Sequence, residues 1–118
     1  MEFKDNIPIY IQIEGCIYRQ IVKGDLNSGD KLPSVRQLAV DLTVNVNTVQ
    51  RALRELVSQG IIYTKRGEGN FITENQELIE ETRRNLIDEE LDDFVTRMRE
   101  LGVDRSELKK LLEEYFNK

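Results

Sequence analysis

The sequence predicts a mainly α-helical fold with one small β-hairpin. Apolar residues recur at helical spacing over most of the 118 residues. Two short runs of β-favouring residues enclose a glycine-containing turn near residue 67. From residue 74 onward the composition shifts to helix formers and contains no proline. We therefore expect two parts, a domain of three helices and a hairpin over residues 1–73 and a helical tail over residues 74–118.

The first of the three helices is predicted near residues 8–23. Its apolar residues recur at every fourth position: Ile9, Ile13, Ile17 and Ile21. Pro8 suits the first helical turn, where its missing N–H needs no partner, and Gly24 suits a left-handed C-terminal cap. Cys16 lies beside the apolar stripe, so we expect a packed thiol rather than a redox sensor.

Two shorter helices are predicted next. Residues 25–30 indicate a turn closed by Pro33, and Ser34 with Gln37 has the spacing of a capping box that begins a helix over residues 34–42. After a break at residues 43–45, Asn45 is expected to cap a third helix that Gly60 ends. The apolar face of the third helix contains Val49, Ala52, Leu53 and Leu56.

A β-hairpin is predicted directly after the third helix, with strands at 61–64 and 70–73 around a basic turn at 65–69. Two short helices separated by a three-residue break, the second with a polar and basic outer face, indicate a helix-turn-helix. The hairpin makes this the winged version of that motif. Its tip would reach the groove next to the one that holds the third helix.

The charges are distributed in keeping with this prediction. The formal net charge is −5, but residues 31–73 contain six basic and three acidic residues, whereas residues 74–118 contain eight basic and fourteen acidic residues. A basic segment suits a nucleic-acid partner. An acidic tail is repelled by phosphate and is expected to stay off the duplex.

Composition also excludes several classes of chemistry. The chain contains no His and a single Cys, which removes Ser–His and Cys–His nucleophilic pairs, mixed Cys/His zinc sites and an internal disulfide. We expect no enzyme activity, no cofactor and no metal. Apolar stretches are only a few residues long, so we expect no membrane segment and a cytoplasmic location.

Six segments occur in an order that is typical of one family: PIYIQI at 8–13, GDL at 24–26, SGDKLPSVRQLA at 28–39, VNVNTV at 44–49, RAL at 51–53 and GEGNF at 67–71. In this order, over about residues 7–73, the chain resembles the GntR family of bacterial transcriptional regulators. Its short helical tail resembles the YtrA branch, which lacks the large effector-binding domain of its relatives. The resemblance implies a homodimer that binds a pseudo-palindromic operator, with Arg36 touching DNA. It further suggests control of a neighbouring transporter operon, and we expect repression.

The residue types suit contact with double-stranded DNA. Ser34, at a helix start, can offer its hydroxyl and backbone N–H to a phosphate, while Asn and Gln suit adenine and Arg suits guanine or phosphate. The glycines of the turn allow close approach of the backbone, and its basic side chains suit the minor groove or the backbone. The expected DNA-binding residues are Ser34, Arg36, Asn45, Asn47, Thr48, Gln50, Arg51, Lys65, Arg66, Gly67 and Gly69.

The chain departs from the family pattern at the third helix. Many members carry Arg where Val46 stands, and often Arg where Gln50 stands, so base choice is expected to depend on Asn47, Gln50 and Arg51. Val46 suits either a thymine methyl or a buried position at the helix start. Arg54 is more easily explained as a solvated helix charge than as a DNA contact.

The tail is expected to form the dimer. Its apolar residues step by four, three, four and three, Gly102 then breaks the helix, and Asp104 with Glu107 begins a short final helix. The expected dimerisation residues are Ile87, Leu91, Phe94, Met98, Leu101, Leu108 and Leu112. A tail of this length cannot enclose a large pocket alone, so whether an unknown small-molecule effector binds, for example at the dimer interface, stays open.

Two other functions fit less well. A winged-helix adaptor for protein–protein contact would have no reason to place Arg36, Arg51, Lys65 and Arg66 on the three elements that converge on a duplex. A small carboxylate hydrolase would need two carboxylates converging in a cleft, and no such spacing stands out.

Overall fold

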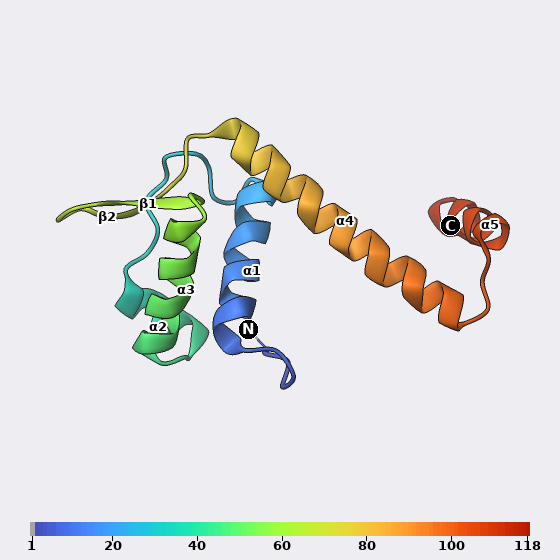
Figure 1. Cartoon of the computed structure of the whole chain (residues 1–118), viewed down its shortest axis with the longest axis horizontal. Coiled ribbons are helices and arrows are strands. Elements are labelled where there is room, and N and C mark those ends of the chain that lie inside the picture. The colour runs from blue at the N-terminus through green and yellow to red at the C-terminus, as the bar shows by residue number, and fades with distance from the viewer. Residues whose placement is uncertain (1) are drawn as a thin grey trace. The chain divides into compact units, whose positions relative to one another are not determined.

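A computed structural model describes residues 2–118 of the chain (Figure 1). Within these residues the elements are α1 (Ile9–Lys23), α2 (Val35–Leu42), α3 (Val46–Ser58), β1 (Ile62–Lys65), β2 (Gly69–Ile72), α4 (Gln76–Glu100) and α5 (Arg105–Phe116). The mainly α-helical fold with a single hairpin is therefore confirmed. No helix of the described part is long and apolar enough to cross a membrane.

The chain divides into two compact units, one reaching to Arg83 and one from Arg84 to Lys118. This boundary falls beyond residue 73, where the composition shifts. The reason is that Leu78 and Ile79, in the first turns of α4, pack against the core of the N-terminal unit. The start of α4 therefore belongs physically to that unit.

The helix boundaries follow the predicted caps with two corrections. Gly24 ends α1 in the left-handed region at a φ of 94°, and Asn45 Oδ1 accepts the backbone N–H of Asn47 at 2.7 Å. Pro8 caps α1 instead of lying in its first turn, so the helix begins at Ile9. The predicted capping box forms only by half: Ser34 Oγ accepts the Gln37 N–H at 3.1 Å, but the Gln37 side chain donates to Asp41 Oδ1 at 2.7 Å.

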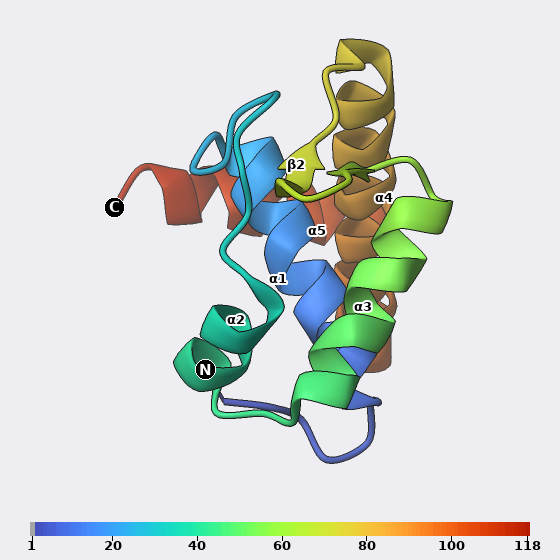
Figure 2. The same cartoon turned by 90° about the vertical axis from the view of Figure 1, so that its left-hand side faces the viewer.

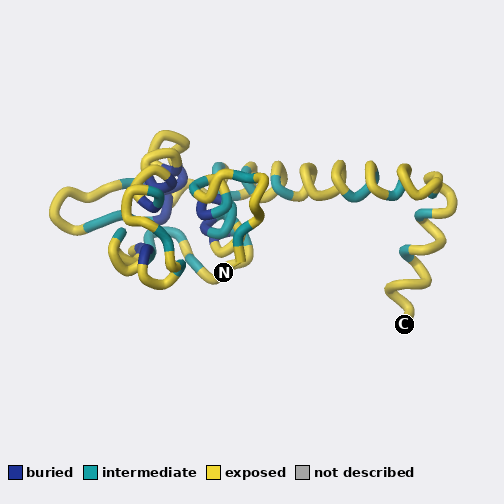
Figure 3. Tube along the Cα trace, turned by 90° about the horizontal axis from the view of Figure 1, so that it is seen from below, coloured by how far each residue is buried: buried dark blue, intermediate teal, exposed yellow. Residues whose placement is uncertain are grey.

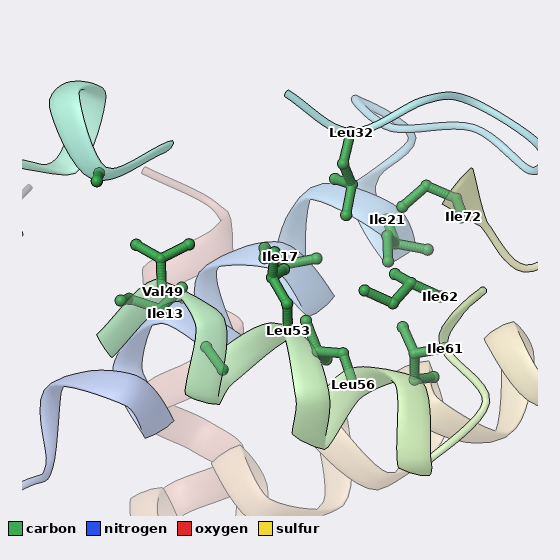
Figure 4. Packing of buried hydrophobic residues seen from close by; sticks show 12 residues of the cluster. Ile13, Ile17, Ile21, Leu32, Val49, Leu53, Leu56, Ile61, Ile62 and Ile72 are labelled. Atoms are coloured by element: carbon green, nitrogen blue, oxygen red, sulfur yellow. The ribbon is translucent and has the colours of Figure 1, made fainter. Parts of the chain in front are cut away.

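The core of the N-terminal unit lies between α1, α3 and the hairpin (Figure 4). Its buried apolar residues are Ile13, Ile17, Ile21, Leu32, Ala39, Val49, Ala52, Leu53, Leu56, Ile61, Ile62 and Ile72. Each fully buried Val, Leu or Ile side chain among them stabilises the fold by about 1.5–3 kcal/mol. The predicted apolar stripe of α1 is buried except at its first member, since Ile9 is 42% exposed at the helix start.

Strand β2 is hydrogen-bonded along both of its edges. β1 and β2 pair antiparallel with Ile62 opposite Ile72 and Lys65 opposite Gly69. Residues 29–32 run along the free edge of β2, where the Leu32 N–H donates to the Asn70 carbonyl at 2.8 Å and the Ile72 N–H donates to the Asp30 carbonyl at 2.8 Å. The sequence indicated only a turn at 25–30, so this third segment is new. It joins the hairpin to the start of α2.

The second unit lacks a core of its own. Neither α4 nor α5 contains a buried residue, and along them the trace in Figure 3 alternates only between intermediate and exposed. Asp104 Oδ1 accepts the Glu107 N–H at 2.9 Å and so begins α5 where the sequence predicted.

Candidate nucleic-acid interface

The predicted contact residues come from three elements of the N-terminal unit. Figure 2 shows α2 and α3 beside each other with the hairpin next to α3. We call the start of α2, the outer face of α3 and the turn of the hairpin the reading surface, and residues 62–72 the wing. All of the predicted residues are exposed except Thr48 and Gly69, which are half-buried. The fold therefore places the predicted set on accessible elements.

The faces of α3 follow from which side is buried. Val49, Ala52, Leu53 and Leu56 lie in the core, so the positions on the opposite side of the helix face solvent. These outward positions are Asn47, Gln50, Arg51 and Arg54. Thr48 lies on the flank. Val46 is 38% exposed, which excludes the buried alternative for this residue.

Arg51 has a partner that the sequence did not indicate. Its guanidinium carbon lies 3.9 Å from the centre of the Tyr10 ring, near the start of α1. Cation–π stacking of this kind favours one orientation of a long, otherwise mobile side chain. The sequence offered one signal for this contact. The apolar stripe of α1 predicts that α1 packs against another helix, and Tyr10 lies beside the first residue of that stripe.

Arg51 also acts electrostatically on the buried carboxylate of Glu14 in α1. Glu14 is only 8% exposed, and burial raises the pKa of its carboxyl, as does the nearby carboxylate of Glu55, while the positive charge of Arg51 lowers it. Burial, followed by Glu14 and Glu55, raises the pKa of Tyr18 to about 12. The charge of Arg51 thus partly offsets the negative charge of Glu14, although the two form no ion pair.

In the wing, Lys65 packs against a pair of stacked aromatic rings. Tyr63 and Phe71 stack with their ring centres 5.7 Å apart, and Lys65 Nζ lies 4.7 Å from the centre of the Phe71 ring. A β-carbon at Gly69 would lie 3.0 Å from Lys31 Cε, and the φ of Gly69 is 121°, so a side chain there is strained. Lys31, outside the predicted set, therefore lies next to the wing.

The cations of the reading surface form no ion pair within the described residues. The ion pairs there are Lys23 with Asp25, Arg83 with Glu80 and Arg84 with Asp88. None of these involves the cations of α2, α3 or the wing. No ion pair there competes with phosphate for these side chains, and the described residues hold no cluster of metal-ligating side chains.

Comparison with known families gives one clear match. The profile described as "Bacterial regulatory proteins, gntR family" matches residues 9–72, which is the span from the start of α1 to the end of the wing.

Two curated relatives from Bacillus subtilis match over nearly the whole chain. The uncharacterized HTH-type transcriptional regulator YhcF is 43% identical over 107 residues, covering 91% of this chain and 88% of that protein. The HTH-type transcriptional repressor YtrA is 38% identical over 112 residues, covering 94% of this chain and 86% of that protein.

Solved structures agree with these relatives. A GntR family transcriptional regulator from Listeria monocytogenes superposes with a TM-score of 0.87 at 39% identity, covering 95% of this chain and 98% of that one. The DNA-binding domain of AraR in complex with an operator superposes with a TM-score of 0.56 at 28% identity, covering 62% of this chain and 89% of that one. The similarity therefore extends from the wing-bearing unit to the tail.

Proposed function

Because the chain belongs to the GntR family and is a DNA-binding transcriptional regulator rather than an enzyme, we propose that it acts as a homodimeric repressor that binds an inverted-repeat operator. The observation that carries the proposal is the reading surface itself. Three elements present exposed cations that form no ion pair among the described residues, and the operator complex of AraR offers a structural precedent for this unit on DNA. The operator form and the dimer are parts of the proposal.

In this proposal α3 lies in the major groove. Asn47, Gln50 and Arg51 contact base edges, since amides pair with adenine and guanidinium pairs with guanine. Ser34 and Arg36, at the start of α2, hold the phosphate backbone, because a helix start offers backbone N–H groups and favours negative charge. Asn45 and Thr48 support the entry of α3. Lys65, Arg66, Gly67 and Gly69 bring the wing to the adjacent groove.

The dimer is proposed from the second unit. Its apolar side chains remain exposed in a single chain: Ile87 is 37%, Leu91 is 53% and Leu101 is 73% exposed. Phe94, Met98, Leu108 and Leu112 are only half-buried. A second copy covers such faces, and a two-fold pair spaces two reading surfaces for an inverted repeat.

Repression is the proposed outcome because a dimer on a promoter-proximal operator obstructs polymerase, and the relative YtrA is named a repressor. A regulator of this kind works in the bacterial cytoplasm, where the chromosome lies. Control of a neighbouring transporter operon, which the family resemblance suggests, completes the proposal.

The proposal is tested by selecting binders from randomised duplexes at two salt concentrations. We expect one inverted repeat to be enriched and to bind at least about a thousandfold more tightly than random duplex, with an affinity that falls steeply as salt rises. Binding that is weak, blind to sequence and lost with salt would overturn it and favour the adaptor alternative.

The control uses matched arginine variants. Arg36→Ala should weaken operator binding by about 1–3 kcal/mol, because Arg36 contacts DNA in this proposal. Arg19→Ala removes an exposed cation of α1 outside the reading surface and should leave the affinity nearly unchanged. If the chain were a protein–protein adaptor, Arg36→Ala and Arg19→Ala would have the same effect on DNA binding.

A further inference from the structure

A groove between α3 and the wing shares only one residue, Gln50, with the predicted contact set. Its volume is about 630 Å³, and its lining comes from the start of α2, the outer face of α3 and both strands of the wing. We call it the wing groove, and its lining residues are Val35, Gln50, Leu53, Arg54, Val57, Ser58, Thr64 and Asn70. On α3 the lining includes Gln50, a proposed base contact, and on the wing it includes Thr64 and Asn70, which pair with each other next to the tip of the hairpin.

The place of the wing groove between α3 and the wing determines which part of the DNA can occupy it. In the proposed docking, α3 lies in the major groove and the wing in the neighbouring groove, and one strand of the DNA backbone separates these two grooves. That strand must cross the hollow between α3 and the wing. Resting on the proposed function, we infer that the wing groove is a clamp for one phosphodiester unit, with Arg54 as its cation and Asn70 as its amide donor.

The chemistry of the lining fits a sugar and a phosphate. Val35, Leu53 and Val57 form an apolar part that suits the C–H faces of a deoxyribose. Arg54 supplies the only charge in the lining and belongs to no ion pair among the described residues. A single uncompensated guanidinium suits the single charge of a phosphodiester.

Asn70 is held with its donor available. The Thr64 hydroxyl donates to Asn70 Oδ1 at 2.6 Å, which uses the amide oxygen and leaves the amide nitrogen to donate elsewhere. The backbone of Asn70 is fixed as well, since its carbonyl accepts the Leu32 N–H at 2.8 Å. Thr64 is therefore a positioning residue, and Asn70 reaches the phosphate.

The test measures operator affinity as a function of salt for the full chain and its variants. Arg54→Gln should weaken binding about five- to tenfold at low salt and reduce the slope of log K against log salt by about 0.9, the value for one lost phosphate contact. Arg54→Lys should restore the slope because it keeps the charge. The order of preference among altered operators should not change, since a phosphate carries no base information. Arg19→Gln is the matched control.

A neutral backbone locates the contact. Methylphosphonate substitution at the phosphate between the bases read by α3 and those read by the wing should weaken binding by the wild-type chain and have no further effect on Arg54→Gln. Thr64→Val should weaken binding in the wild-type background but not in an Asn70→Ala background. Thermal melting of each variant confirms that it is folded.

The outcomes separate the clamp from the proposed function. If the wild-type chain binds its operator specifically but Arg54→Gln keeps the full salt slope, or the methylphosphonate effect is unchanged in that variant, the clamp is overturned and the function stands. If Arg54→Gln alters base preference, Arg54 is a base contact and the clamp is also overturned. If the wild-type chain shows no specific binding, both are overturned.

Discussion

The two units of the chain differ in the burial of their apolar residues. The N-terminal unit buries a cluster drawn from α1, α3 and the wing, and residues such as Leu56 and Ile72 are fully enclosed. In the second unit Leu101 is 73% and Phe116 is 77% exposed, and no residue of α5 is buried. The first unit can fold on its own contacts. The second unit leaves its apolar faces exposed, and in the proposed dimer a second copy covers them.

This difference assigns a separate task to each unit. A unit that is stable by itself can present a rigid reading surface, whose side chains are held by α3 and the wing. In the proposed function, the second unit completes itself by pairing with the same unit of a second chain. Variants that act on one unit but not on the other therefore test this assignment.

Breaking the second unit should have the largest consequence. Leu91→Glu places a carboxylate in the proposed dimer contact, where burial of an unpaired charge is costly, while it disturbs no core of the single chain because Leu91 is 53% exposed. We expect the dimer to dissociate and operator affinity to fall by about 10²–10⁴-fold, since the two reading surfaces then bind independently. Analytical ultracentrifugation and fluorescence anisotropy measure the two effects.

The control for this variant is Glu89→Gln, which changes an exposed residue off the apolar seam of α4. It should leave both mass and affinity unchanged. A Leu91→Glu chain that remains dimeric would show that the α4 seam does not form the dimer.

Shortening a core side chain should lower the stability of the N-terminal unit whether or not the chain dimerises. Leu56 is fully buried, so Leu56→Ala should destabilise the N-terminal unit by about 2–5 kcal/mol at every protein concentration. Leu101→Ala, by contrast, should lower the melting temperature only through the dimer, and its effect should therefore change with protein concentration. Calorimetric melts over a hundredfold range of concentration distinguish these cases, and a concentration-independent effect of Leu101→Ala would contradict the comparison.

The stacked arginine of the reading surface comes next. Arg51→Ala should weaken operator binding by about 1–3 kcal/mol because a base or phosphate contact is lost. Tyr10→Leu should cause a smaller loss, since Arg51 remains but its orientation is no longer favoured, whereas Tyr10→Phe keeps the ring face and should bind like the wild-type chain. Equal affinities for the leucine and phenylalanine variants would show that the stacking does not matter.

The smallest effect is expected from the buried carboxylate of α1. Burial raises the pKa of Glu14 above its ordinary value of 4.5, so the folded unit favours the protonated form and is penalised when Glu14 is ionised. Glu14→Gln should therefore raise the melting temperature by a few degrees at pH values above the raised pKa. The gain should vanish as pH falls below the ordinary value, where Glu14 is protonated in the folded and unfolded states alike. A gain that is constant with pH would contradict this explanation.

Much of the fold was accessible from the sequence because its signals are local. The isoleucine spacing of α1, the Asn45 cap of α3 and the left-handed Gly24 each depend on a few neighbouring residues. The half-formed capping box was not predictable, because the Gln37 side chain had two partners within reach and Asp41 lies one helical turn away. The unit boundary likewise depends on Leu78 packing onto a distant core.

The reading surface shows the same division. Residue types and spacing indicated its elements, yet the contacts that orient its side chains depend on how those elements pack. Tyr10 of α1 stacks on Arg51 of α3, and Thr64 of β1 donates a hydrogen bond to Asn70 of β2. Such pairs depend on tertiary packing, and a single sequence contains no direct signal for them.

The most direct test of the division into a reading unit and a pairing unit is the mass of the full chain in solution, free and on its selected operator, by sedimentation equilibrium. The chain has a mass of 13.8 kDa, and we predict twice that mass without DNA and two chains on each duplex that carries one inverted repeat. One chain per duplex, bound with full affinity to a single half-site, would contradict this division.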